Sequence, residues 1–248
     1  MPSPARDPGV QSWTFRNFKP IEAMLAQVRA VGASRIELCG AHAAFSDPTA
    51  HAPAIAACRA AGVEVCSIGV QTFTDQPQVE KHWFEFARAA GASTISAHVK
   101  VDSFHRAIPA ARALCEAYDL RLSLHCHGGY MFGGSADVLA HLLDLGGERI
   151  GITLDTAWCL QSGNADPAAW VRRFAGRIYG VHYKDFVWDR NGRWSETIPG
   201  DGTLDLAGLV KALDETGFAG WTVVEYEATP EQPGPAVAEA LRRIRALG

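Results

Sequence analysis

The sequence predicts a single (β/α)8 TIM barrel, one α/β domain over residues 1–248. Short β-branched runs alternate with alanine-rich stretches of helical period along the whole chain, and no linker interrupts them. Eight candidates of each kind share 248 residues, which is about 31 per unit, the usual length of a strand, a helix and two loops. The nucleotide fingerprints GxGxxG after the first strand, GxxxxGKS and GxxxxGKT do not occur, which disfavours an open doubly wound sheet.

Each expected strand is a short run rich in β-branched residues. In chain order the runs are GVQSW from 9, RIELC from 35, VEVCSIGV from 63, TISAHV from 94, RLSLHCH from 121, RIGITLD from 149, RIYGVHYKD from 177 and WTVVEYE from 221. Apolar residues at helical spacing between them predict helices at 21–31, 54–61, 79–90, 104–118, 136–145, 167–174, 206–216 and 236–247. Glycines such as Gly91 and Gly217 stand where a helix should end. Residues 185–203 form the one long irregular piece, and such a loop is usually a lid or a binding loop.

The composition excludes several classes of protein. With 48% apolar and 20% charged residues, the chain can bury a large core and is not disordered. Its 23 basic and 27 acidic side chains give a net charge of −4 without a broad basic cluster, so no nucleic-acid partner is expected. No apolar run approaches the roughly 18 residues of a membrane helix and the start lacks a secretory signal, so we expect no membrane partner and a cytoplasmic location. The six cysteines form no CxxC pair and are expected to be reduced.

Ionisable residues fall on one face of the expected strands. Successive strand residues point to opposite faces, so if Leu122 and Leu124 face the helices, His125 faces the barrel interior. The same parity, at the carboxyl ends of six strands, holds Glu37, His98, His125, Asp155, His182 and Glu225. Barrel enzymes build their active sites at that end from several strands at once. The pattern therefore predicts one site in the mouth of the barrel.

A cation would make this concentration of ionisable groups tolerable. Each unpaired buried charge would otherwise cost several kcal/mol. Two histidines and two carboxylates form a nitrogen and oxygen donor set suited to Mn²⁺, Co²⁺, Zn²⁺ or Mg²⁺. The chain has no HExxH and no cysteine ligand spacing, which disfavours a structural zinc site or a zincin protease. A glycosidase, which needs two carboxylates roughly 5 to 10 Å apart, stays open through Glu37, Asp155 and Glu225.

Five short motifs together carry a family resemblance. They are LHCH at 124–127, LDTAW at 154–158, HYKD at 182–185, PGDGTLD at 199–205 and VVEYE at 223–227. In this order and spacing they resemble the sugar phosphate isomerase/epimerase superfamily, the xylose-isomerase-like barrels that include inosose dehydratases and ketose 3-epimerases. GVQSWTF at 9–15 is similar to the opening strand of that family. The resemblance implies one divalent metal, most often Mn²⁺, bound by His125, Asp155, His182 and Glu225.

The chain departs from the family pattern at two positions. Many members, notably the ketose 3-epimerases, carry on the fifth strand a glutamate that is both a ligand and an acid/base, and this chain has His125 there. Many members also carry a histidine three residues after the sixth-strand aspartate, where this chain has Trp158. The first departure argues against a two-carboxylate epimerisation. The second provides an apolar wall for a sugar-like ring.

These features predict an enzyme that removes a proton next to a carbonyl of a small polyhydroxylated substrate, a sugar or a keto-polyol. The product would be an isomer or an epimer; a dehydratase or lyase of keto-inositols or 3-keto-glycosides is the alternative. Glu225 is the expected base, His127 or His98 the acid, and Lys184 a group that holds a substrate oxygen. The expected substrate contacts are Gln11, Trp13, Glu37 and Trp158. No nicotinamide cofactor is expected, because the chemistry is proton transfer.

Two other classes remain open at this stage. A barrel that binds a sugar without catalysis would be consistent with His125, and a phosphoesterase would need more metal ligands than four strand ends offer. Trp188 and Trp194 in the loop after the seventh strand could close the mouth or contact another subunit, so a homo-oligomer is also left open.

Overall fold

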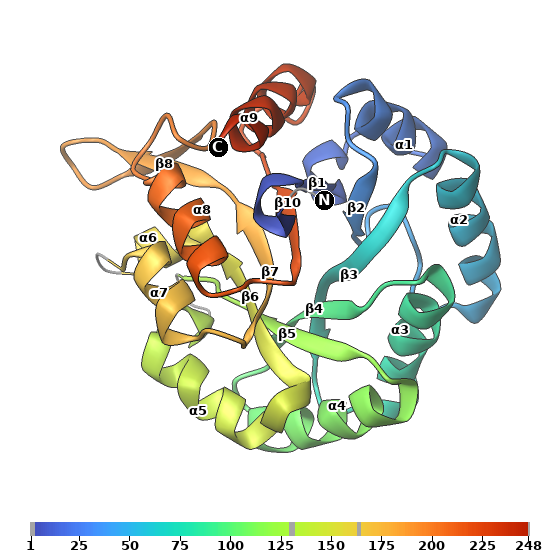
Figure 1. Ribbon diagram of the computed structural model, residues 1–248. Coiled ribbons are helices and arrows are strands. Elements are labelled where there is room, and N and C mark those ends of the chain that lie inside the picture. The colour runs from blue at the N-terminus through green and yellow to red at the C-terminus, as the bar shows by residue number, and fades with distance from the viewer. Residues whose placement is uncertain (1–2, 129–131, 163–164, 248) are drawn as a thin grey trace.

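The strands of the chain close into one parallel barrel (Figure 1), as the computed structural model describes it over residues 3–128, 132–162 and 165–247. Their order around the barrel is β1–β10–β7–β6–β5–β4–β3–β2. The bounds are β1 (Gly9–Gln11), β2 (Arg35–Leu38), β3 (Glu64–Phe73), β4 (Thr94–Val99), β5 (Arg121–His125), β6 (Ile150–Asp155), β7 (Ile178–Tyr183) and β10 (Trp221–Val224). Every neighbouring pair is parallel, so the predicted barrel is confirmed.

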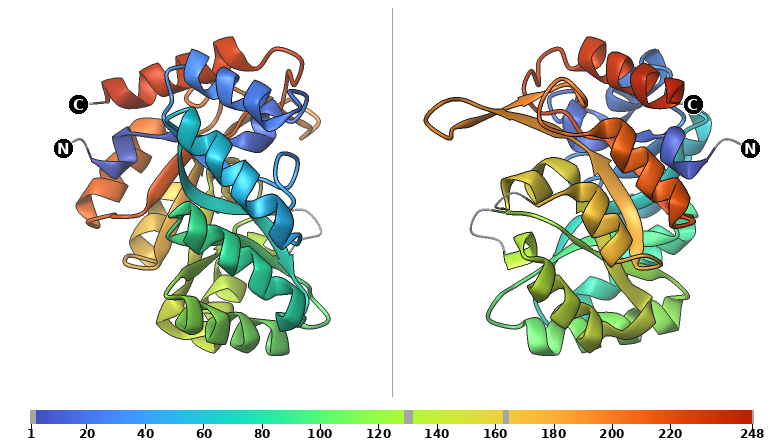
Figure 2. Two further views of the ribbon diagram at one scale, coloured as in Figure 1. Left: turned by 90° about the vertical axis from the view of Figure 1, so that its right-hand side faces the viewer. Right: turned by 60° about the vertical axis from the view of Figure 1, so that its left-hand side comes forward.

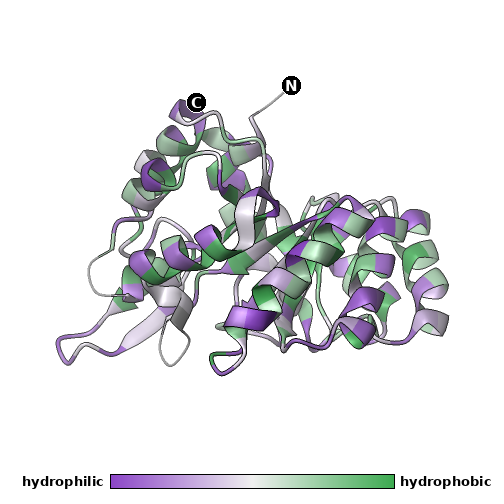
Figure 3. Ribbon diagram, turned by 90° about the horizontal axis from the view of Figure 1, so that it is seen from below, coloured by the Kyte–Doolittle hydropathy of each residue, from purple (hydrophilic) through white to green (hydrophobic). Residues whose placement is uncertain are grey.

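Helices surround the barrel and carry hydrophobic and hydrophilic residues on the same turns (Figures 1 and 3). Those expected from the sequence are α1 (Ile21–Ala30), α2 (Pro48–Ala60), α3 (Pro77–Ala90), α4 (Phe104–Tyr118), α5 (Ala136–Gly146), α7 (Pro167–Arg173), α8 (Leu206–Glu215) and α9 (Gly234–Ala246). Helix α2 starts earlier than predicted, because the Asp47 side chain accepts from the Thr49 N–H and Pro48 favours a first turn. A further short helix, α6 (Thr156–Gln161), was not predicted and follows β6 directly.

The two faces of the strands separate as their parity predicts. Leu122 and Leu124 of β5 are buried among the hydrophobic residues packed against the helices. Inside the barrel, polar side chains satisfy one another: the Ser96 hydroxyl donates to Thr153 Oγ1 at 3.1 Å, and the Ser123 and Thr153 hydroxyls lie 2.6 Å apart. A hydrogen-bonded set of hydroxyl groups therefore forms part of the barrel interior.

Residues 185–203 are more regular than the sequence suggested. Strands β8 (Asp185–Trp188) and β9 (Trp194–Thr197) pair antiparallel, with Trp188 opposite Trp194. Figure 2 shows this hairpin projecting beyond one end of the barrel, with the N-terminus at the other end. The expectation of an irregular loop was wrong because an Asn-Gly turn signal was overlooked: Gly192 has φ +75°, a conformation that Asn191-Gly192 readily supplies.

Asp185 anchors the chain that returns from the hairpin. Its carboxylate is buried and accepts four backbone N–H groups, from Gly200, Gly202, Thr203 and Leu204, at 2.9 to 3.0 Å. A carboxylate is the one side chain compact enough to offer this many acceptors. The bonds fix the hairpin base beside the end of β7, and thereby the geometry around the barrel mouth.

All six cysteines are buried and free in the structure. Within the described ranges, no helix has the length and apolar character needed to cross a membrane.

Candidate metal centre and active site

Two histidines and two carboxylates come together at neighbouring strand ends. His125 ends β5, Asp155 ends β6, His182 lies in β7 and Glu225 follows β10. The register explains the meeting, since Asp155 pairs with His182 and His182 pairs with Val223, two residues before Glu225. Each offers one ligand atom, and the four atoms lie within 4.8 Å of one another. These are the four residues that the family resemblance selected.

The spacing of these atoms fits a single ion. His182 Nδ1 lies 3.3 Å from both His125 Nε2 and Glu225 Oε2. Asp155 Oδ2 lies 3.7 Å from His125 Nε2 and 3.9 Å from His182 Nδ1. Ligands held about 2.0 to 2.2 Å from one ion are roughly 3.0 to 3.6 Å apart. Small side-chain shifts would therefore complete the coordination.

Asp155 gives the most specific indication that these four side chains fit a cation. One oxygen, Oδ1, accepts the Trp158 N–H at 3.0 Å and caps α6. The other, Oδ2, is buried, and no group in the described part of the chain hydrogen-bonds it. Burial raises the pKa of this carboxyl, against the attraction of Lys184. An unpaired carboxylate oxygen directed at two imidazoles is what a cation would satisfy.

The imidazole of His182 is oriented from behind. Its Nε2 lies 2.6 Å from Glu37 Oε2, which leaves Nδ1 directed at the other ligands. Glu37 is 0% exposed and is itself held by Gln11 and by the Ser67 hydroxyl. Burial lowers the pKa of His182, but Glu37 and Glu225 outweigh burial and raise it to about 10. The proton that these carboxylates attract is the one that a cation would replace.

The sequence predicts Glu37 as a substrate contact, but in the structure Glu37 lies behind His182. Its carboxylate is fully used by Gln11, Ser67 and His182, and it does not line the cavity described below. The parity argument correctly directs Glu37 inward but cannot show its depth along the barrel axis. The structure makes it an orienting residue for His182.

A cavity of about 420 Å³ opens onto two of the four candidate ligands. Its lining consists of Gln11, Trp13, Cys39, Gly40, Ala41, Gly69, Val70, His98, His125, His127, Trp158, Lys184, Glu225 and Glu227. Apart from Glu37, all the catalytic and substrate-binding residues suggested by the sequence reach this one space. The lining combines aromatic and small apolar residues with seven polar or ionisable side chains that converge on one space, as in a small-molecule site.

Aromatic rings form one wall of the cavity. The His127 ring stacks on Trp158, with centroids 3.9 Å apart and planes 27° apart. Trp158 in turn contacts Trp194, a residue of the hairpin, in an edge-to-face arrangement at 5.5 Å.

His98 lies edge to face against His125 at 5.1 Å, and burial, aided by its histidine neighbours, lowers the pKa of His98 to about 2. His98 is therefore neutral at physiological pH.

Lys184 is the buried cation of the site. It is 2% exposed, its Nζ lies 3.4 Å from Glu225 Oε2, and it also contacts Glu227 Oε1. Burial lowers the pKa of Lys184, but Glu225, Asp155 and Glu227 outweigh it and raise the pKa. The ammonium therefore stays charged. On Glu225, Lys184 and His182 together outweigh burial and lower the pKa, so this carboxylate stays ionised.

Two acidic residues near Lys184 were not predicted. Glu227 lines the cavity, and its shared parity with Glu225 could have identified it. Glu196 arrives on β9, where its Oε2 accepts the Glu227 N–H at 2.9 Å. Burial raises the pKa of Glu196 to about 8. Its position depends on the hairpin, where the sequence predicts an irregular loop.

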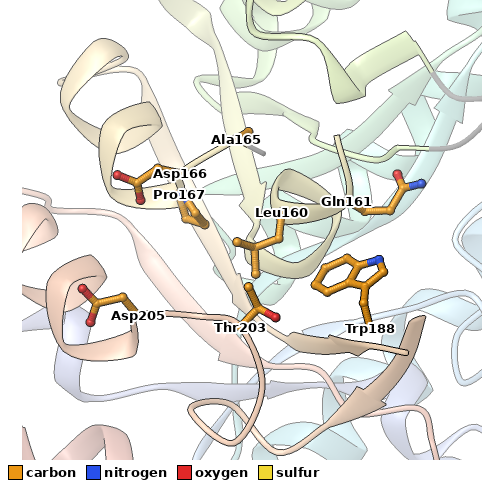
Figure 4. A pocket seen from close by; sticks show the side chains of 8 residues that line it. All are labelled: Leu160, Gln161, Ala165, Asp166, Pro167, Trp188, Thr203 and Asp205. Atoms are coloured by element: carbon orange, nitrogen blue, oxygen red, sulfur yellow. The ribbon is translucent and has the colours of Figure 1, made fainter. Parts of the chain in front are cut away.

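A second cavity, of about 510 Å³, lies outside the barrel mouth between α6, α7 and the hairpin (Figure 4). Its two carboxylates, Asp166 and Asp205, cap α7 and α8 by accepting the Ala168 and Gly208 N–H groups. Because these carboxylates serve the helix ends, the described lining residues of this cavity offer no comparable chemistry.

Known proteins resemble the chain in sequence and in structure. It is 35% identical to the rhizopine catabolism protein MocC of Rhizobium meliloti over 48% of this chain and 40% of that protein. It is 33% identical to an inosose dehydratase of Klebsiella pneumoniae over 47% of this chain and 44% of that protein. The matched segments thus span less than half the length of either relative. A xylose isomerase domain protein from Planctomyces limnophilus superposes with a TM-score of 0.74 at 20% identity, covering 90% of this chain and 91% of that one.

The family assignment rests on most of the chain. Residues 25–247 match the family described as xylose isomerase-like TIM barrel. The match runs from α1 to α9 and contains all four candidate metal ligands. The chain belongs to the xylose isomerase-like TIM barrel family.

Proposed function

We propose that the protein is a divalent-metal-dependent enzyme that removes the proton next to a carbonyl of a polyhydroxylated ring and then expels a β-hydroxyl group. The observation that carries the proposal is the set of four ligand atoms within 4.8 Å beside a cavity of about 420 Å³. His125, Asp155, His182 and Glu225 would hold the ion. The mixed nitrogen and oxygen donor set suits several divalent ions, and Mn²⁺ is the one that the family resemblance favours. When bound, such an ion acts as a Lewis acid that polarises a carbonyl oxygen.

Glu225 is the proposed base. Among the described residues, it is the one carboxylate that belongs both to the ligand group and to the cavity lining. Its pKa is held down by Lys184 and His182 against the effect of burial, so it is ionised and can accept a proton.

Lys184 is the proposed acid for the departing hydroxyl. Its ammonium lines the cavity and stays charged between Glu225 and Glu227. His98 and His127, on the opposite part of the lining, would hold hydroxyl groups of the substrate. The Trp158 ring would pack against the C–H face of the ring.

The distribution of carboxylates favours elimination over epimerisation. Among the described residues that line the cavity, the carboxylates are Glu225 and Glu227, and both follow β10. Epimerisation by two bases needs groups on opposite faces of one carbon, whereas elimination can use one base with an acid on the same side. The inosose dehydratases at 26–33% identity support the same outcome and point to keto-inositols as substrates.

The test is a two-part assay in deuterium oxide with Mn²⁺ and a keto-inositol. The wild type should exchange the proton next to the carbonyl and release the dehydrated product. Lys184→Met should retain exchange but lose product by roughly 10²- to 10⁴-fold, while Glu225→Gln should lose both. Metal content measured in each variant serves as the control. A metal-loaded wild type without exchange on keto-inositols, keto-sugars or 3-keto-glycosides would contradict the proposal.

A further inference from the structure

The cavity is larger than the substrate that the metal centre needs. A single six-carbon ring with its oxygens has about 12 non-hydrogen atoms and a van der Waals volume on the order of 150 Å³, so it occupies about 200 Å³ at normal packing density. The cavity measures about 420 Å³. Room for a second ring therefore remains after the first ring is placed at the ligand group.

Trp13 stands at the exposed end of this space. It lines the cavity and is 41% exposed, although a large aromatic surface is usually buried. It follows β1, so its indole belongs to the barrel mouth and not to the hairpin.

The Trp13 side chain is held in one orientation. Its Nε1–H donates to Glu227 Oε2 at 2.7 Å, and its backbone N–H donates to Gln11 Oε1 at 3.0 Å. The Arg16 guanidinium lies 5.3 Å from the ring centroid and donates to the carbonyls of Trp13 and Glu227. An exposed ring that is fixed in advance loses little conformational entropy when a ligand stacks on it.

Two short chains of contacts connect Trp13 to the metal ligands. Gln11 joins its backbone to Glu37, which orients His182. Glu227 joins its indole to Lys184, which contacts Glu225. The ring thus has a fixed position relative to the reacting centre, as a specificity subsite requires.

We propose that Trp13 forms a second binding subsite, where its indole stacks on a second ring joined by a glycosidic oxygen to the ring at the metal centre. The inference rests on the proposed function and extends its substrate class from single keto-inositol rings to keto rings that carry a second ring through a glycosidic oxygen. The Glu227 carboxylate beside the indole is balanced by Lys184 and by Arg16, whose guanidinium lies 3.9 Å from it, so this end of the cavity favours an uncharged second ring, a sugar or an aromatic aglycone.

Inert probes test the subsite without turnover. Phenyl and methyl β-D-glucopyranoside share one sugar ring and differ only in the second group. Calorimetric titration into Mn²⁺-loaded wild type should give about tenfold tighter binding of the phenyl glycoside. Trp13→Ala should abolish this difference and leave methyl glycoside binding within about twofold. Trp13→Phe should retain part of the difference.

Trp188→Ala is the matched control, because Trp188 lines the cavity outside the barrel mouth. It should keep the full preference for the phenyl glycoside. Equal binding of both glycosides by the wild type, or no detectable binding of the phenyl glycoside, overturns the subsite, as does an equal loss of both in Trp13→Ala. Neither probe has a carbonyl, so the binding test does not depend on the proposed reaction. If keto substrates show no deuterium exchange, the proposed reaction is refuted and the result of the binding test still stands.

Discussion

Asp155→Asn should make the metal-free protein more stable and the metal-bound state inaccessible. In the metal-free protein the unpaired Oδ2 of Asp155 lies 3.7 and 3.9 Å from imidazole nitrogens. The neutral amide removes the buried carboxylate charge, its NH₂ can donate to Nε2 of His125, which burial keeps neutral, and the Asn carbonyl oxygen keeps the cap on Trp158 N. The same NH₂ cannot coordinate a cation.

The magnitudes follow from these contacts. Leaving a buried polar group unpaired costs about 1 to 3 kcal/mol, so in EDTA the variant should be more stable by up to that amount. At free Mn²⁺ 100 times the dissociation constant, the wild type should gain about 2.7 kcal/mol and the variant close to nothing. For a chain of 248 residues, that gain corresponds to roughly 5 to 10 °C in melting temperature.

Urea denaturation in EDTA and in Mn²⁺ measures all four free energies of unfolding. In EDTA the variant should have the larger free energy of unfolding, and in Mn²⁺ the wild type should have the larger one. A variant that is less stable than the wild type in EDTA would show that the unpaired Oδ2 does not destabilise the metal-free protein. A variant that gains as much as the wild type from Mn²⁺ would show that the ion binds elsewhere.

Three further substitutions probe the residues around the centre. Glu37→Leu, which removes the acceptor for His182 Nε2, should weaken Mn²⁺ binding by about 10- to 100-fold in calorimetry. Glu37→Gln should lose less Mn²⁺ affinity, because its amide oxygen can still accept from His182 while its NH₂ donates to Ser67. Asp185→Asn, which offers one oxygen to four backbone N–H groups, should lower the free energy of unfolding by about 2 to 4 kcal/mol in urea. Burial raises the pKa of Glu196 from 4.5 to about 8, so between these values the folded protein holds a proton that the unfolded chain has lost and stability falls as pH rises. Glu196→Gln should therefore match the wild type near pH 4 and exceed it increasingly up to pH 9, as measured by melting temperature across pH.

Each of these expectations has a contrary outcome. Equal Mn²⁺ affinity in Glu37→Leu would remove Glu37 from the metal site. An Asp185→Asn change below about 0.5 kcal/mol would mean that the loop is held by other contacts. A constant stability difference across pH for Glu196→Gln would mean that this carboxyl titrates normally in the folded protein.

The barrel and the meeting of the four candidate ligands could be predicted because both follow from short-range rules. Side-chain parity is fixed by the strand itself, so Leu124 and His125 had to face opposite sides. Parallel strand ends meet at one end of a closed barrel, so inward residues at 125, 155, 182 and 225 had to converge. The motifs then singled out these four among the inward ionisable residues.

The depth of a side chain and the course of a loop were harder to predict. Glu37 has the inward parity, yet the register of β2 against β1 and β3 places it beside Gln11 and Ser67, behind His182. Glu196 reaches Glu227 only through the hairpin, whose Asn-Gly turn was the one local signal of its course. Both cases depend on contacts between distant segments, which periodicity does not encode.

The central claim is that one divalent ion binds between His125, Asp155, His182 and Glu225. An anomalous difference map from a crystal of the protein soaked in Mn²⁺ tests it most directly, with Asp155→Asn crystals as the control. The account predicts one peak per chain, about 2.0 to 2.2 Å from the four ligand atoms, and no peak there in the variant. A wild-type map without density at this position, or with its peak at another cluster of residues, would contradict it.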